Sequence, residues 1–372
     1  MVDARESGVR RTRIDAEMKK LTVLNVAYPL ACVGPDAVGG AEQVLTALDR
    51  ALAEAGHHSL VIACEGSQAA GELIAVPAEN GRIDDEARRR AHARHREAIA
   101  AARIRWDVDV VHLHGIDFDA YLPEDGPTLV TLHLPLDWYA PASLRPNRHD
   151  LWLHPVSASQ LAGAPAGAIL HPPISNGVNV ERLSARHSRR NFALILSRVC
   201  PEKGIHLALD AARAADLPLL IGGQVYRYEA HERYFDDEIR PRLDARRRFL
   251  GPLGFERKRR FLNAARCLVV PSLAHETSSL VAMEALACGT PVVAFPNGAL
   301  PEVIDHGRTG FLVRDTAEMA HAMKVAGMLD PDLCRSTAER RFPLEKMILS
   351  YMDAYRALAA VKGERPDLAT AR

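Results

Sequence analysis

Short apolar runs alternate with helix-like segments along nearly the whole of this chain. The runs at residues 21–28 (LTVLNVAY) and 59–63 (SLVIA) are apolar at almost every position, which is typical of strands buried on both faces of a sheet. Between them, residues 41–55 carry apolar side chains at helical spacing, and Gly56 follows where a helix commonly ends. This alternation predicts an α/β fold in which helices cover both faces of a parallel sheet.

The pattern occurs twice, and the second series of apolar runs begins at residues 192–197 (FALILS). A chain of 372 residues is too long for one ordinary core, so it predicts two domains. We expect a poorly ordered extension at 1–20, a first Rossmann-like doubly wound domain at 21–175, a second at 176–341 and a last amphipathic helix within 342–362. Two such domains leave a cleft between them, and the loops that follow the strands should supply its residues.

The stretch after the predicted strand at 267–271 contains two carboxylates, Glu276 and Glu284, eight residues apart. On one continuous helix eight steps would leave them about 80° out of line, so they serve one site most easily with Glu276 in a loop and Glu284 in a helix. Thr277, Ser278 and Ser279 are good N-cap residues, which places the start of that helix between the two carboxylates. A helix N-terminus favours a phosphate group.

This stretch resembles the family-4 retaining glycosyltransferases (GT4, group 1). Their hallmark is a Glu, seven residues, and then Glu-Ala-hydrophobic-Ala-x-Gly-x-Pro-Val-Val-Ala, which Glu276 and residues 284–294 (EALACGTPVVA) match. The resemblance extends across most of the chain. It implies the GT-B fold, in which two Rossmann-like domains face a cleft and the C-terminal helix, here 342–362, crosses back to the first domain. It also implies a hexosyltransferase that takes a nucleotide-diphospho sugar as co-substrate, without a cofactor or a metal.

The resemblance also implies roles for single residues. Arg198 and Lys203 would bind the donor's diphosphate, since their motif follows the first strand of the second domain. Glu284 would bind the ribose and Glu276 the donor sugar. His133, at the end of the strand at 128–133, would hydrogen-bond a sugar hydroxyl or share developing charge. The expected catalytic residues are His133, Arg198, Lys203 and Glu276, and the expected donor-binding residues are Gly39, Gly40, Gly222, Gly223, Thr277, Ser278, Ser279, Leu280 and Glu284.

One departure from the family pattern leaves a second function open. The family usually has Gly-Phe-Gly after the first Glu, where this chain has Thr277-Ser278-Ser279. The alternative to a transferase is therefore a glycosyltransferase-like subunit that binds a sugar nucleotide without turnover. A sugar-nucleotide epimerase of the same fold is a third reading, which the motif at 284–289 does not support. The sequence does not identify the donor sugar, the nucleobase, the acceptor, the linkage or the oligomeric state.

The charge balance excludes one class of partner. The chain has 47 Lys and Arg against 47 Asp and Glu, so it lacks the positive field with which proteins coat nucleic acid. The Arg-rich helix predicted at 84–105 lacks a large apolar face, which favours a solvated surface over weak peripheral contact with anionic lipid. No apolar run is long enough to span a membrane, and residues 1–20 do not resemble a secretory signal.

Six scattered cysteines without metal-ligand spacing are expected to be buried, reduced thiols of a cytoplasmic protein. The D-x-D sequences at 107–109 and 117–119 are interpreted as chance matches, and the two histidines of residues 110–115 (VVHLHG) as structural or acceptor-site residues without a third metal ligand. We therefore expect no metal site.

Overall fold

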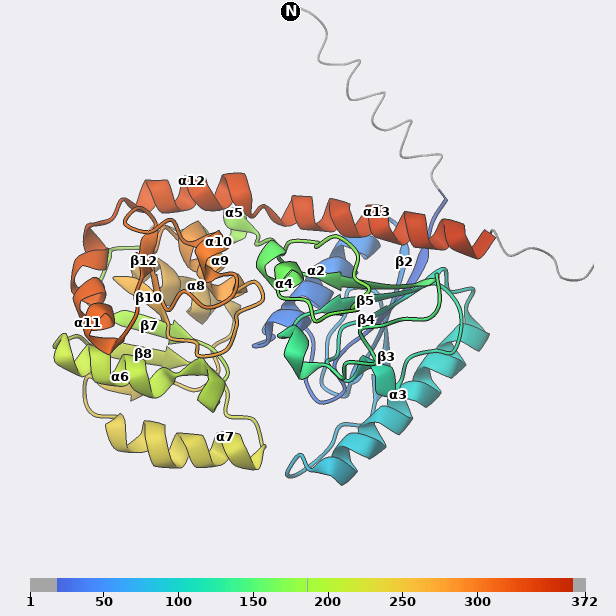
Figure 1. Cartoon of the computed structure of the whole chain (residues 1–372), viewed down its shortest axis with the longest axis horizontal. Coiled ribbons are helices and arrows are strands. Elements are labelled where there is room, and N and C mark those ends of the chain that lie inside the picture. Colours follow the sequence, from blue (N-terminus) through green and yellow to red (C-terminus); the bar gives the residue numbers. More distant parts are fainter. Residues whose placement is uncertain (1–18, 186, 364–372) are drawn as a thin grey trace, which may run out of the picture.

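The computed structural model describes residues 19–185 and 187–363, and it contains two six-stranded parallel sheets with helices packed on them (Figure 1). The extension expected at 1–20 lies outside the described residues, apart from Lys19 and Lys20. The α/β architecture predicted from the alternating pattern is confirmed, because all ten pairings between named strands are parallel.

The first sheet has the strand order β3-β2-β1-β4-β5-β6. Its strands are β1 (Thr22–Val26), β2 (His58–Cys64), β3 (Glu72–Val76), β4 (Val110–Leu113), β5 (Thr128–Leu132) and β6 (Leu151–Pro155). The helices of this half are α2 (Gly40–Glu54), α3 (Asp85–Arg105) and α4 (Ala158–Ala162). Asp84 accepts a hydrogen bond from the backbone N–H of Ala87 and so caps α3, which begins one residue after the predicted start.

The second sheet has the order β12-β11-β10-β7-β8-β9. Its strands are β7 (Ala193–Leu196), β8 (Leu219–Gly222), β9 (Arg247–Phe249), β10 (Cys267–Val270), β11 (Val292–Ala294) and β12 (Gly310–Leu312). The helices of this half are α5 (Val180–Leu183), α6 (Ile205–Ala214), α7 (Glu229–Tyr234), α8 (Phe255–Ala264), α9 (Leu280–Ala287), α10 (Leu300–Val303), α11 (Thr316–Val325) and α12 (Pro331–Arg341). Strands β3, β6 and β12 are absent from the sequence prediction.

The last helix, α13 (Leu344–Gly363), returns the chain to the first sheet, and Figure 1 shows α12 and α13 nearly end to end along one side of the molecule. Met347, Tyr351 and Tyr355 are buried in a cluster with residues of β1, β4, β5 and α2. The Tyr355 hydroxyl lies 2.8 Å from Nδ1 of His112, and the Tyr351 hydroxyl lies 3.1 Å from Oγ1 of Thr131. The tyrosine hydroxyls of α13 therefore join a buried network with His112 and Thr131, which also contact each other at 2.8 Å.

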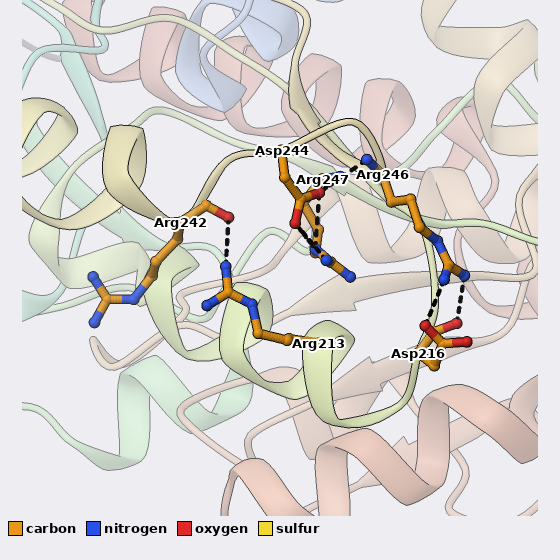
Figure 2. Close-up of polar contacts among 6 residues, drawn as sticks. All are labelled: Arg213, Asp216, Arg242, Asp244, Arg246 and Arg247. Carbon is orange, nitrogen blue, oxygen red and sulfur yellow. Dashed lines mark hydrogen bonds and ion pairs between the residues drawn. The ribbon is translucent and has the colours of Figure 1, made fainter.

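The outer strand of the second sheet, β9, is short and rich in arginine, which discourages pairing with another chain. The loop before it is held by ion pairs (Figure 2): Arg246 contacts Asp216 at 2.5 Å, and Arg247 pairs with Asp244. The same Asp244 carboxylate accepts a backbone N–H from Arg246 at 2.9 Å. These contacts hold the loops at this edge, which lies away from the cleft described below.

The cysteines differ in one respect from the expectation. Five are buried, but Cys32 is exposed, so the prediction of buried thiols is wrong at this position. Cys32 lies in the loop between β1 and α2, where the chain runs over the surface of the first domain.

Candidate functional site

A cleft of about 400 Å³ lies between the two sheets. Its walls include the loops that follow β1, β4 and β5 in the first sheet and β7, β8 and β10 in the second. The strand order reverses between β1 and β4 and again between β7 and β10, and ligands of doubly wound sheets bind at such points. The cleft is lined by ten of the residues predicted from the sequence: Gly39, Gly40, His133, Arg198, Lys203, Glu276, Thr277, Ser278, Ser279 and Leu280.

The loop after β7 brings a cation to the loop after β10. Lys203 forms an ion pair with Glu276, and both side chains are largely buried. Burial is the largest single influence and would raise the pKa of Glu276, but the charge and hydrogen bond of Lys203, a hydrogen bond from Ser272 and the charge of Arg198 together lower it. Glu276 is therefore held as a carboxylate, and Lys203 retains two further N–H donors for a ligand.

Arg198 lies in the same wall, and among the described residues it forms no ion pair within 4 Å. Burial opposes its charge, but the Cys200 thiol and the Glu42 carboxylate raise the pKa of Arg198. Glu42 is itself buried, and this raises its pKa. The cleft therefore contains a desolvated guanidinium with free donors, which is the arrangement that a phosphate group requires.

The segment between the two carboxylates departs from the expected capping geometry. Helix α9 begins at Leu280 with Ser279 at the N-cap position, but the Ser279 side chain makes no capping hydrogen bond. Its backbone is left-handed, at φ 61 and ψ 65, and within the described part of the chain the buried hydroxyls of Ser278 and Ser279 have no hydrogen-bond partner. The prediction that these serines cap the helix is therefore wrong, although the helix does begin between Glu276 and Glu284. The hydroxyls and the first N–H groups of α9 are left free to bind a ligand in the cleft.

We expect the change Ser279→Gly to stabilise the protein by about 1 kcal/mol, because glycine adopts a left-handed backbone without strain. Urea unfolding measures the effect. Ser278→Gly is the matched control, since Ser278 has no positive φ and should lose stability on this change. Equal changes in the free energy of unfolding for the two substitutions would show that the Ser279 backbone is not strained.

His133 connects the cleft to the interior of the first sheet. Its Nε2 lies 3.0 Å from Nδ1 of His114, and its carbonyl oxygen accepts a hydrogen bond from the Thr277 hydroxyl at 2.8 Å. Burial lowers the pKa of His133 to about 3, so the ring is neutral near pH 7. A neutral ring can hydrogen-bond a sugar hydroxyl, whereas the alternative that His133 shares charge as an imidazolium is disfavoured. The bond to Thr277 also ties the two domains together at the cleft.

Three predicted residues do not line the cleft. Glu284 lies one turn into α9, where its Oε1 is 2.5 Å from Nζ of Lys258 on α8. A Cβ on Gly223 would collide with the carbonyl oxygen of Ser197, and one on Gly222 with Leu196 and Leu253, so packing explains both glycines. Their assignment to donor binding stays a prediction.

Sequence reasoning assigned no role to Glu42 or Lys258, which are charged and lie near the cleft. Glu42 lies two residues after Gly40, and its closeness to the Gly39-Gly40 turn was a signal that it would face the site. Lys258 gave no such signal, because it is one of several basic residues on α8. Its Nζ also lies 3.4 Å from Oε1 of Gln43, so it contacts both domains.

One group in the described part of the chain has the residue types and spacing of a metal site. Single ligand atoms of Cys200, Glu202 and His231 lie within 4.8 Å of one another. The positive charge of Arg198 acts on both Cys200 and His231, and burial raises the pKa of the Cys200 thiol to about 11. Both conditions oppose binding of a divalent cation. One aspartate of each D-x-D sequence is engaged elsewhere, since Asp109 binds Lys19 and Asp117 binds Tyr121.

Comparison with known proteins agrees with this geometry. Residues 190–326 match the family Glycosyl transferases group 1, and residues 38–163 match Glycosyltransferase Family 4. The chain belongs to the family-4, group 1 glycosyltransferases. It is therefore a member of an enzyme family with the GT-B fold, as the motif at 276–294 implied. No helix in the described residues of this glycosyltransferase is both long and apolar enough to cross a membrane.

Similarity to single proteins is more distant. The glycosyltransferase is 28% identical to a phosphatidyl-myo-inositol mannosyltransferase of Mycobacterium leprae over 331 residues, which cover 78% of this chain and 83% of that one. It spans about half, 53%, of an uncharacterised glycosyltransferase of Methanocaldococcus jannaschii, at 26% identity. Its fold is that of the sucrose-phosphate synthase of Thermosynechococcus elongatus, with a TM-score of 0.75 at 21% identity over 91% of this chain and all of that one. An Anabaena protein, HepE, solved in complex with UDP-glucose, has a TM-score of 0.65 at 20% identity over the same shares of the two chains.

Proposed function

We propose that this glycosyltransferase moves a sugar from a nucleotide-diphospho-sugar donor to a hydroxyl group of an acceptor, with retention of anomeric configuration and without a metal ion. Its fold neighbour HepE is described in complex with UDP-glucose, which supports a donor of this class. Retention is proposed from family membership. The acceptor's class, whether glycan, glycolipid or small molecule, is left open by the residues of the cleft.

The observation that carries the proposal is the convergence of two cations and a helix N-terminus on one side of the cleft. Arg198 and Lys203 follow β7, and the start of α9 follows Glu276. As the bond between the sugar and the diphosphate breaks, negative charge grows on the leaving phosphate. The guanidinium, the ammonium and the free N–H groups of α9 stabilise that charge in a site with little water.

The other residues hold the sugar. Glu276 is kept ionised by Lys203, so it accepts hydrogen bonds from sugar hydroxyls. Neutral His133 approaches from the first domain, and its contact with Thr277 holds the two walls together. Closure of the two domains excludes water, which would otherwise hydrolyse the donor.

The test is a panel of UDP-, GDP- and ADP-sugars, each measured by thermal shift and then by release of free nucleoside diphosphate with a mixture of hydroxyl acceptors. We expect one donor to raise the melting temperature and to release nucleotide at the same rate in EDTA. NMR of the product then reports its anomeric configuration. Release that EDTA abolishes would contradict metal independence, and an inverted product would contradict retention.

The alternative function, a subunit that binds a sugar nucleotide without turnover, is kept because this chain has Thr277-Ser278-Ser279 where the family usually has Gly-Phe-Gly. It predicts thermal stabilisation by a donor without nucleotide release under any acceptor condition. Stabilisation by none of the donors would contradict both functions.

A further inference from the structure

Two cysteines that are far apart in the sequence meet at one end of the first sheet. Cys64 is the last residue of β2, and Cys32 lies in the loop after the neighbouring strand β1. Their Sγ atoms are 3.2 Å apart, although both residues are free thiols. A disulfide bond needs the two sulfurs at about 2.05 Å, so bond formation requires a movement of roughly 1.2 Å.

The two backbone segments are already fixed against each other. The N–H of Val33 donates to the Ser67 hydroxyl at 3.1 Å, and the N–H of Gln68 donates to the carbonyl oxygen of Val33 at 2.9 Å. Val33, the residue after Cys32, therefore contacts the turn that lies three and four residues after Cys64. These contacts hold the two backbone segments that carry the cysteines side by side, within reach of each other's side chains.

The two thiols differ in their access to solvent. Cys32 is exposed, so a small molecule can reach its sulfur, whereas Cys64 is buried behind it. Burial raises the pKa of the Cys64 thiol to about 12. An exposed thiol in contact with a buried one has the arrangement of an attacking cysteine and a resolving cysteine.

We propose that Cys32 and Cys64 form a thiol–disulfide exchange site, at which a low-molecular-weight disulfide converts the pair to an intramolecular disulfide. The Cys32 sulfur attacks one sulfur of the small disulfide, which forms a mixed disulfide and releases one small thiol. The Cys64 sulfur then attacks Sγ of Cys32, which closes the protein disulfide and releases the second small thiol. Each protein thiol loses its proton to a released thiolate, so two protein thiols are oxidised and one small disulfide is reduced.

The disulfide would fix a loop that touches both domains. Asp36, four residues after Cys32, accepts a hydrogen bond from the backbone N–H of Phe255 at 2.7 Å, at the first residue of α8. The same loop leads directly into the Gly39-Gly40 turn of the cleft. Because a closed loop restricts the unfolded chain, the oxidised protein is expected to melt at a higher temperature than the reduced protein.

The experiment uses the full chain, reduced, desalted and then incubated with oxidised glutathione. After an acid quench, denaturation and alkylation, mass spectrometry counts the free thiols and identifies linked peptides. We expect four of the six cysteines to be alkylated and the peptides of Cys32 and Cys64 to be joined, with full reversal by dithiothreitol. Cys64→Ala should stop at a single glutathione adduct on Cys32, and Cys32→Ser should leave Cys64 free.

The matched control is Cys334→Ala, which removes a buried thiol on α12 and should exchange as the wild type does. A wild-type protein that keeps a stable glutathione adduct on Cys32 would overturn the proposal, and so would one that does not react. Formation of the disulfide in Cys32→Ser with another cysteine would also overturn it. These outcomes are independent of any sugar donor, so they leave the proposed transferase function unaffected.

Discussion

Arg198→Ala is expected to slow nucleotide release by about 10²–10³-fold, because it removes a preorganised cation from the charge that develops on the leaving diphosphate. Arg198 is desolvated and, among the described residues, has no ion-pair partner within 4 Å, so its donors are available to the ligand. The stability of the protein should change little, since no ion pair of the fold is broken. Steady-state release of nucleoside diphosphate from the donor found in the panel measures the effect.

Arg190→Ala is the control, because Arg190 is an exposed arginine on the same domain and away from the cleft lining. It should release nucleotide at the wild-type rate. The role of Arg198 is contradicted if the two variants are slowed equally, or if Arg198→Ala retains wild-type release while its melting temperature is unchanged.

Glu284→Ala is expected to lower the free energy of unfolding by about 3–5 kcal/mol, because it leaves Lys258 as an unpaired charge in a largely buried position. The pair joins α8 to α9, and both side chains have little exposure, 14% for Lys258 and 8% for Glu284. Chemical denaturation measures the loss. A variant lacking only Glu284 therefore reports stability together with any role in binding the ribose.

The double variant Lys258→Met/Glu284→Leu separates the two effects, since it removes both charges and keeps apolar volume. We expect it to recover most of the lost stability, and a double-mutant cycle gives the coupling energy. If Glu284 also binds the ribose, the double variant should fold but bind nucleotide weakly. Wild-type nucleotide affinity in the refolded double variant would assign Glu284 a structural role alone.

In both sheets, the strands beside the point where the strand order reverses were predictable from the sequence. Their apolar runs are continuous because both faces of these strands are buried. The strands β1 and β10, for example, begin or end within two residues of the predicted runs. Strand β3 escaped prediction because it lies at the sheet edge, and its residues Glu72–Val76 are mostly exposed or half-buried. An edge strand lacks the continuous burial that makes the pattern visible.

The carboxylate motif predicted the surroundings of Glu276 better than those of Glu284. The Glu276 side chain lies in the cleft beside Lys203, as the neighbouring motifs suggested. The pairing of Glu284 with Lys258 was not predictable, because the two lie 26 positions apart with a strand between them and helix α8 offers several basic residues. Contacts of this kind depend on how elements pack in space, which spacing along the chain does not encode.

The backbone at Ser279 and the pair of cysteines illustrate the same limit. The sequence placed good capping residues at 277–279, but the loop geometry imposes a left-handed backbone on Ser279, in which its hydroxyl does not cap the helix. Cys32 and Cys64 have no meaningful spacing in the sequence, yet the parallel pairing of β1 and β2 brings them together. Both arrangements are set by tertiary packing, which the local sequence does not show.

The central claim is that Arg198 and Lys203 form the diphosphate site of a nucleotide-sugar transferase, and calorimetric titration with UDP, GDP and ADP tests it most directly. We expect one nucleotide to bind the wild type and the exposed-lysine control Lys324→Ala with equal affinity, and to bind Lys203→Ala at least ten-fold more weakly. Equal affinity of all three proteins for that nucleotide, or binding of no nucleotide by the folded wild type, would contradict the claim.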